Sequence, residues 1–170
     1  VAFSGSAADA IAGPTITGTT PGPALVLPVI TNITTGVTAV AAIPAASGIT
    51  PGAVTISDVN SADPTKAGTI STIAVSNYAT VTINDNALTI LSLTGGSGAI
   101  NINNPATIPT NKTLGLTLSA VTGGTLTDSN VYTTLNLNSS GSAANSIANV
   151  ADAALTALNV SGTQKMTLLS

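Results

Sequence analysis

The chain has 170 residues, of which only 5% are charged, and its formal charge of −3 comes from six acidic residues and three lysines. Three dispersed lysines cannot make the basic surface that a nucleic-acid-binding protein needs. His and Cys are absent, which excludes a conventional catalytic triad, a thiolate nucleophile and an ordinary zinc site. We therefore expect neither a nucleic-acid-binding protein nor an enzyme.

Residues 1–51 are predicted to form an irregular or small β segment rich in Pro and Thr. Proline removes a ladder donor and is confined to edges, turns and strand starts. The longest uncharged stretch worth testing as a membrane span, 24–43, contains Pro28, Asn32 and Gly36, so we do not expect it to span a membrane. Six of the nine prolines lie in this first part: Pro14, Pro21, Pro23, Pro28, Pro44 and Pro51.

Residues 52–170 are predicted to form a repetitive domain of short strands, so the fold class is all-β. Val, Ile and Leu alternate with Thr, Ser and Asn, a mixture that packs well on a pleated surface. Gly, Ser and Asn clusters separate the strands, as turns require. The strands are expected at 53–57, 69–76, 79–84, 87–94, 99–103, 113–119, 132–138, 155–161 and 165–169. Segment 142–155 also has apolar residues at helical spacing, which leaves a short helix or coil open there.

The chain contains one phrase twice, at 83–102 and 150–168, in which Asp85 aligns with Asp152 and Leu91 with Leu158. Equivalent positions recur at intervals of 18, 25, 19 and 23 residues, at Ile73, Leu91, Leu116, Leu135 and Leu158. A period near twenty indicates units that bury their apolar faces only by stacking. We therefore predict a β-solenoid-like stack with these side chains pointing inward: Leu88, Leu91, Leu93, Leu155, Leu158 and Val160.

The runs at 52–58, 67–75 and 87–95 resemble the calcium-dependent, type I-secreted surface-layer (S-layer) proteins of Gram-negative bacteria and their repeats-in-toxin relatives. The run at 154–162 is similar to their recurring strand phrase, and the resemblance covers about residues 52–170. It implies a secreted protein of the bacterial cell surface that self-assembles into a lattice with Ca²⁺. Besides other copies of the chain, the resemblance makes a cell-surface polysaccharide a candidate partner.

Calcium prefers six to eight oxygen ligands, and three Asp/Asn clusters supply candidates. The strongest is Asp58, Asn60 and Asp63; Asp85 and Asp128 mark the other two. The alternative is that these residues make turns by hydrogen bonding to their own backbone. The calcium-binding loop of the family begins Gly-Gly-x-Gly-x-Asp, whereas here the run 95–99 is followed by Ile100. The sequence thus departs from the family's diagnostic motif.

The sequence predicts a structural subunit, or a fragment of one, in a self-assembling extracellular bacterial surface layer. A β-repeat adhesin or an extracellular filament subunit is the alternative. An ice-binding solenoid is a third reading, because Thr-x-Thr occurs at 15–17, 80–82 and 125–127. These Thr pairs do not recur in every repeat.

Overall fold

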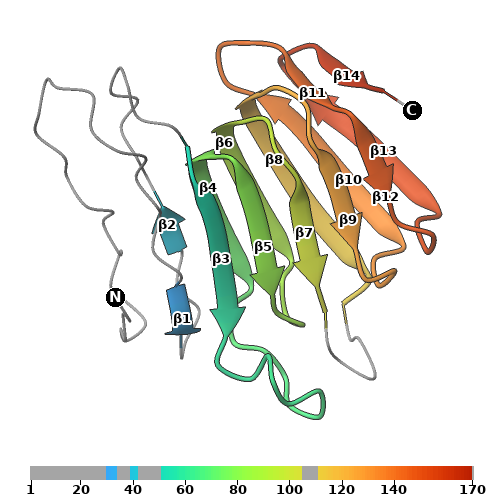
Figure 1. The fold of residues 1–170 in the computed structure, drawn as a ribbon. Helices are drawn as coiled ribbons and strands as arrows, with labels where there is room; N and C mark the ends of the chain where they lie inside the picture. Colours follow the sequence, from blue (N-terminus) through green and yellow to red (C-terminus); the bar gives the residue numbers. More distant parts are fainter. Residues whose placement is uncertain (1–29, 34–38, 42–50, 105–110, 170) are drawn as a thin grey trace, which may run out of the picture.

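The structure, a computed structural model, describes residues 30–33, 39–41, 51–104 and 111–169, with only the backbone described in the first two ranges. Across these ranges it contains fourteen strands and no helix (Figure 1). The prediction of an all-β fold is confirmed. No helix in this part of the chain is long and apolar enough to cross a membrane.

The strands alternate between two parallel sheets, so the chain winds into a β-solenoid of about five turns. Figure 1 shows the sheets one behind the other, with the sequence running from β1 and β2 at one end to β12 and β13 at the other. Sheet A consists of β1 (Ile30–Ile33), β3 (Ala53–Asp58), β5 (Thr80–Asn84), β7 (Ile100–Asn103), β9 (Thr125–Asp128) and β12 (Asn149–Ala151). Sheet B consists of β2 (Ala39–Ala41), β4 (Thr72–Tyr78), β6 (Ile90–Gly96), β8 (Thr113–Val121), β10 (Thr134–Ser140) and β13 (Ala157–Gly162). A third, two-stranded sheet pairs β11 (Asn145–Ile147) with β14 (Met166–Leu168).

The core lies between sheets A and B, because buried and partly exposed residues alternate along each interior strand. In β5, for example, Val81 and Ile83 are buried while Thr80, Thr82 and Asn84 are partly exposed. Successive side chains of a strand point to opposite faces, so one face of each sheet is apolar. The buried side chains stack in ranks across the coils. The core is aliphatic apart from Tyr78 and Tyr132.

The ladders confirm three of the four predicted steps of the repeat and correct the step from Leu116 to Leu135. Ile73 pairs with Leu91 and Leu91 with Leu116, as expected, but Leu116 pairs with Leu137 instead of Leu135. Leu135 belongs to the rank of Leu114 and Leu158. The two copies of the phrase are therefore stacked two residues out of the predicted register. A shift of two residues keeps every side chain on its face, which is why the sequence pattern still gave the correct inward positions.

The helical alternative for 142–155 is wrong. That segment contains β11 and β12, separated by Ala148, and Asn145 and Ile147 are buried. Three strands were not expected, namely β9, β11 and β12. Each has only three or four residues, too few for an alternating pattern to be recognised.

The last coil differs from the predicted core. Leu158 and Val160 lie in ranks with the buried Leu135 and Leu137, yet they are 40% and 54% exposed. Leu155 is partly buried against the core. The inward direction was predicted correctly, but burial was not, because no strand lies beyond β13 in sheet B among the described residues.

The first strands extend the same two sheets. β1 pairs with β3 and β2 pairs with β4, both in parallel. The rest of the predicted 1–51 segment, including Thr15 to Thr17 and all but the last of its prolines, lies outside the described residues.

Candidate functional site

Aspartates recur at the corner where the chain leaves sheet A. Asp58 and Asp128 are the last residues of β3 and β9, and Asp85 and Asp152 directly follow β5 and β12. Because Ser57 pairs with Asn84, and Thr127 with Ala151, the aspartates adjoin in two pairs along the stack. This corner is the main concentration of acidic groups in the described residues and the natural place to examine the predicted metal ligands.

The Asp58 carboxylate holds the loop that joins β3 to β4. Its Oδ1 accepts a hydrogen bond from Asn60 N at 2.7 Å. Its Oδ2 accepts from the backbone N and the hydroxyl of Thr69, both at 2.7 Å, and from Ile70 N at 3.1 Å. Asp58 is buried. These four donors therefore take the place of the water molecules that would solvate an exposed carboxylate.

The other two residues of the first predicted calcium cluster lie in the same loop with partners of their own. The Asn60 side-chain amide donates to Ala67 O at 2.7 Å. Exposed Asp63 accepts from the backbone N and hydroxyl of Thr65 and forms an ion pair with Lys66 at 3.4 Å. The Thr65 hydrogen bonds, with Lys66 beside them, lower the pKa of Asp63. All three residues thus act in the turn, as the alternative reading expected, and calcium binding stays a prediction.

Asp85 is the least satisfied carboxylate in the described residues. It is fully buried, its Oδ1 accepts from Ala87 N at 3.1 Å, and its Oδ2 has no hydrogen-bond partner there. Burial, with the nearby charge of Asp58, raises its pKa to about 6. Gly68 makes room for it, since a Cβ at position 68 would come within 2.1 Å of Asp85 Oδ1.

Asp128 and Asp152 cap the later turns in the same way. Asp128 accepts from Val131 N at 3.0 Å and from Tyr132 N at 3.1 Å, and Asp152 accepts from Ala154 N at 2.8 Å. Burial raises the pKa of Asp152, and the Asp128 charge adds to the effect. The two carboxylates line a small cavity with Tyr132 that has room for about one water molecule. Within the described residues, no three acidic side chains group closely enough to hold a metal ion.

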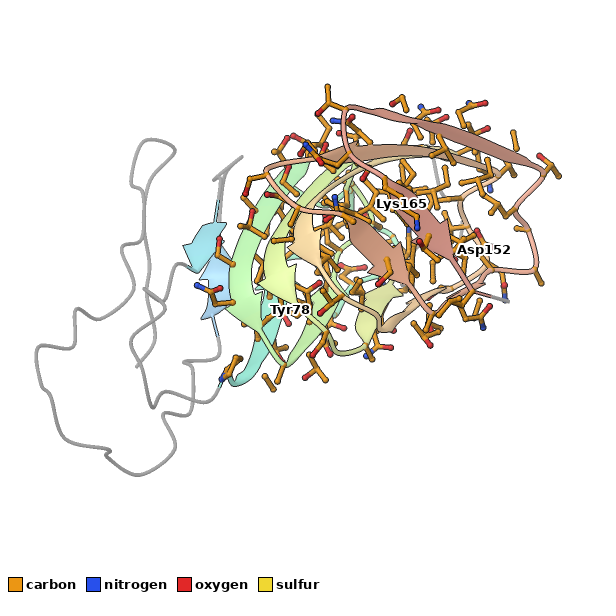
Figure 2. All side chains as sticks on the ribbon, turned by 90° about the horizontal axis from the view of Figure 1, so that it is seen from above. Tyr78, Asp152 and Lys165 are labelled. Atoms are coloured by element: carbon orange, nitrogen blue, oxygen red, sulfur yellow. The ribbon has the colours of Figure 1, made fainter. Side chains whose placement is uncertain are left out.

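Two tyrosines are buried in the core, Tyr132 at the aspartate corner and Tyr78 at the last residue of β4. Tyr132 donates its hydroxyl to Leu88 O at 2.8 Å, and burial together with the charges of Asp85 and Asp128 raises its pKa. Tyr78, labelled in Figure 2, has a buried hydroxyl without a hydrogen-bond partner among the described residues. Burial raises its pKa to about 12. Both tyrosines therefore serve as neutral core residues over the ordinary pH range.

The outer faces of both sheets carry short, uncharged side chains. The outward ranks of sheet A include Ala53–Thr80, Thr125–Asn149 and Thr55–Thr82–Asn101–Thr127–Ala151. Those of sheet B include Ala74–Ser92–Thr117–Asn138–Ser161. The lysines lie off these faces, in turns. Figure 2 shows Lys165 and Asp152 toward the C-terminal end of the stack, away from β1 and β2.

Polar ladders cross these faces, and sequence analysis did not identify them. Asn103 donates to Asn84 at 2.8 Å and Asn84 to the Ser57 hydroxyl at 2.9 Å on sheet A. Asn159 donates to Asn136 at 2.8 Å on sheet B. The sequence contains a pattern that corresponds to these ladders, because each Asn follows an aliphatic residue at an equivalent place in its strand. The pattern can be interpreted as a ladder only when the register between the coils is known.

A buried polar network near the C-terminal end was also missed. Asn145 accepts from Val121 N at 2.9 Å and donates to the Ser139 hydroxyl at 2.9 Å and to Ser140 O at 3.0 Å. Ser139 stands in the rank of Leu93 and Leu118, so a polar pair replaces an apolar layer there. Neither Ser139 nor Asn145 was recognised from the sequence as part of a buried network.

No protein family, curated protein or solved structure matches this chain. The candidate surfaces must therefore be interpreted from their own chemistry.

Proposed function

We propose that this chain is a structural subunit, or a segment of one, of a self-assembling extracellular bacterial surface layer. The observation that carries the proposal is the absence of charged side chains from the outward ranks of both sheets in the described residues. In soluble proteins about a quarter of the residues are charged, and most of these lie on the surface. Faces without charge have little mutual repulsion, so copies can approach face to face.

The shape of the faces supports the same role. Parallel strands lie about 4.7–4.9 Å apart, and side chains no longer than Asn or Thr give a regular surface. Such a surface can make many equal contacts with a neighbouring copy. The S-layer resemblance adds secretion, calcium-dependent assembly and a cell-surface polysaccharide as proposals of the same kind.

Electron microscopy of the purified protein in calcium and then in excess chelator tests the proposal. Ordered sheets that dissolve on chelation are expected, because calcium would bridge acidic loops such as the one that carries Asp63. Sheets that are indifferent to chelation would keep the structural role and remove the metal. Dispersed monomers in both conditions would contradict self-assembly and favour an adhesin, which saturable binding to a glycan surface would identify.

One observation favours the ice-binding alternative. The pairs Thr80–Thr82 and Thr125–Thr127 share the outer face of sheet A. Asn101 of β7 stands between Thr82 and Thr127 in their rank, which interrupts the Thr array. Thermal hysteresis that is lost in Thr82→Lys but kept in the sheet B variant Thr117→Lys would establish this function.

A further inference from the structure

One large apolar side chain stands out from the outer face of sheet B. Ile90, the first residue of β6, is 47% exposed. In β4, β6, β8, β10 and β13 the other outward residues are Thr, Ser, Ala, Gly and Asn. A single exposed Ile needs no explanation by itself. The residue beside it gives this one its meaning.

The neighbour of Ile90 in the next coil is a glycine that the fold does not require. Gly115 pairs with Ile90 in the ladder between β6 and β8. A Cβ at position 115 would meet Thr89 O at 3.5 Å and Ile90 Cγ1 at 3.9 Å, which are ordinary contacts. Gly115 is also not among the glycines with positive φ. Glycine weakens the interior of a strand and often marks a place where another backbone or a ligand approaches closely.

Ile90 and Gly115 form a projection and a notch side by side. Neighbouring strands lie about 4.7–4.9 Å apart, and the missing Cβ of Gly115 leaves open space next to the Ile90 side chain. A rotation of 180° about an axis that runs parallel to the strands, midway between β6 and β8, exchanges the two positions. This part of the face is therefore its own complement, because the projection of each copy meets the notch of the other.

The same axis brings compatible residues together over the rest of sheet B. It places β4 of one copy opposite β10 of the other, and β2 opposite β13, so the axis lies in the middle of the described strands (Figure 1). In the next outward rank, Ser92 of one copy faces Thr117 of the other. In the rank after that, Thr94 faces Ser119. These side chains are short and uncharged, so they neither collide nor repel each other.

The area of this face is sufficient for a specific dimer. At the strand spacing and rise of a β-sheet, the described strands of sheet B cover about 600 Å² of each copy. Two such faces bury about 1,200 Å² together, which reaches the lower end of the range for specific, stable interfaces. The strands β4, β6, β8, β10 and β13 contain no charged residue that would have to be desolvated.

We propose that a second copy of this chain packs face to face on sheet B about this two-fold axis, with Ile90 of each copy in the notch at Gly115 of the other. The proposal rests on the self-assembly role proposed above and names the contact that sheet B makes. A different partner would need its own projection and notch at the same spacing, whereas a second copy has both by symmetry. A two-fold contact closes, so it forms dimers and leaves sheet A available to join them.

Exchanging the projection and the notch between two variants tests this contact. Gly115→Ile has two projections, which collide, and Ile90→Ala has none, which leaves a void. Each variant alone should associate at least about tenfold more weakly than the unmodified chain in sedimentation velocity. An equimolar mixture of the two should recover most of the association, because each projection again meets an open position. The experiment is done in excess chelator, since this contact has no charged group for calcium to bridge.

Two further variants serve as controls. Asn101→Ile adds the same side chain to the outer face of sheet A and should associate like the unmodified chain, which excludes general stickiness of an added Ile. Gly115→Ala fills the notch only in part and should weaken association in the same direction as Gly115→Ile. Circular dichroism confirms that each variant is folded, as expected for outward positions and for a β-branched side chain in a strand.

The outcomes separate this inference from the proposed function. An unmodified chain that stays monomeric in chelator overturns the sheet B contact. So does a Gly115→Ile protein that associates as strongly as the unmodified chain, or a mixture that associates no better than its components. If Gly115→Ile still forms ordered sheets with calcium, the layer role survives and depends on other contacts. If dimers exchange as expected but no sample forms sheets, the contact holds and the layer role is wrong.

Discussion

The interior coil that contains β6 and the last coil that contains β13 are built from the two copies of one phrase, yet they differ in burial. Leu91 in β6 is fully buried, whereas Leu158 in β13 is 40% exposed. Both side chains point toward the space between the sheets. β6 has a neighbouring strand on each side, whereas within the described ranges β13 has one only on the side of β10. In a solenoid the energetic value of a residue therefore depends on the coils beside it as much as on its own sequence.

The largest expected effect comes from placing a carboxylate at the two equivalent positions. Leu91→Asp should abolish cooperative folding, because it buries an unpaired charge in the core. Leu158→Asp should cost only about 1–2 kcal/mol, since its carboxylate can reach water. Urea unfolding followed by circular dichroism measures both free energies of unfolding. Equal destabilisation would mean that the C-terminal end is covered by the rest of the molecule.

Close contact between coils gives the next comparison. A Cβ at position 98 would lie 1.3 Å from the Ala79 carbonyl oxygen, whereas one at position 115 would meet Thr89 O at 3.5 Å, an ordinary contact. Gly98→Ala should therefore destabilise by about 2–3 kcal/mol or more, because the backbones of two coils must separate. Gly115→Ala should change stability by less than about 1 kcal/mol. Thermal melts of the two variants measure the difference, and equal melting temperatures would contradict the coil spacing.

A smaller effect should appear in the pH dependence of stability. The pKa of Asp85 is raised in the folded chain from 3.8 to about 6, so the folded state binds more protons than the unfolded state between these values. Its contribution to stability is therefore greatest below about pH 4, falls as the pH rises to about 6, and is constant above. Asp85→Asn should remove this fall, because its side chain does not titrate.

The measurement is the free energy of unfolding from pH 4 to pH 7, taken as the difference between the unmodified chain and Asp85→Asn. The difference cancels the contributions of the other aspartates. Asp63→Asn is the control, because Asp63 is exposed and its pKa is lowered, so any effect has the opposite sign. A pH-independent difference for Asp85→Asn would show that Asp85 is hydrated in the folded chain.

The smallest expected effect distinguishes an interior ladder position from a terminal one. Asn84 both donates to Ser57 and accepts from Asn103, whereas Asn159 donates to Asn136 at the end of the stack. Asn84→Ala should cost about 1–2 kcal/mol and Asn159→Ala about half as much, since each hydrogen bond contributes about 1 kcal/mol. Chemical denaturation of both variants measures the costs. A larger cost for Asn159→Ala would contradict the ladder as the source of stability.

The sequence predicted local features well where a pattern was long enough to recognise. Alternation in 53–57 and 79–84 predicted β3 and β5 almost to the residue. The repeat predicted that Leu91 and Leu116 stack. Short strands such as β9 and β11 were missed, because three or four residues do not establish a period. The sequence identified the Asp and Asn residues of the corners as either turn residues or metal ligands. Their role in the turns became visible only with the hydrogen bonds of the structure.

The sequence by itself determined that this chain is all-β, that its coils repeat about every twenty residues, and which face of each long strand is apolar. These properties follow from side-chain branching and from the two-residue period of a strand, which are local. Only the tertiary structure decided the register of Leu135 against Leu116, the burial of Asp85 and the exposure of Val160. Each of these properties depends on which coil lies alongside. The sequence does not specify that neighbour locally, because a parallel ladder joins residues about twenty positions apart through backbone groups that every sequence shares.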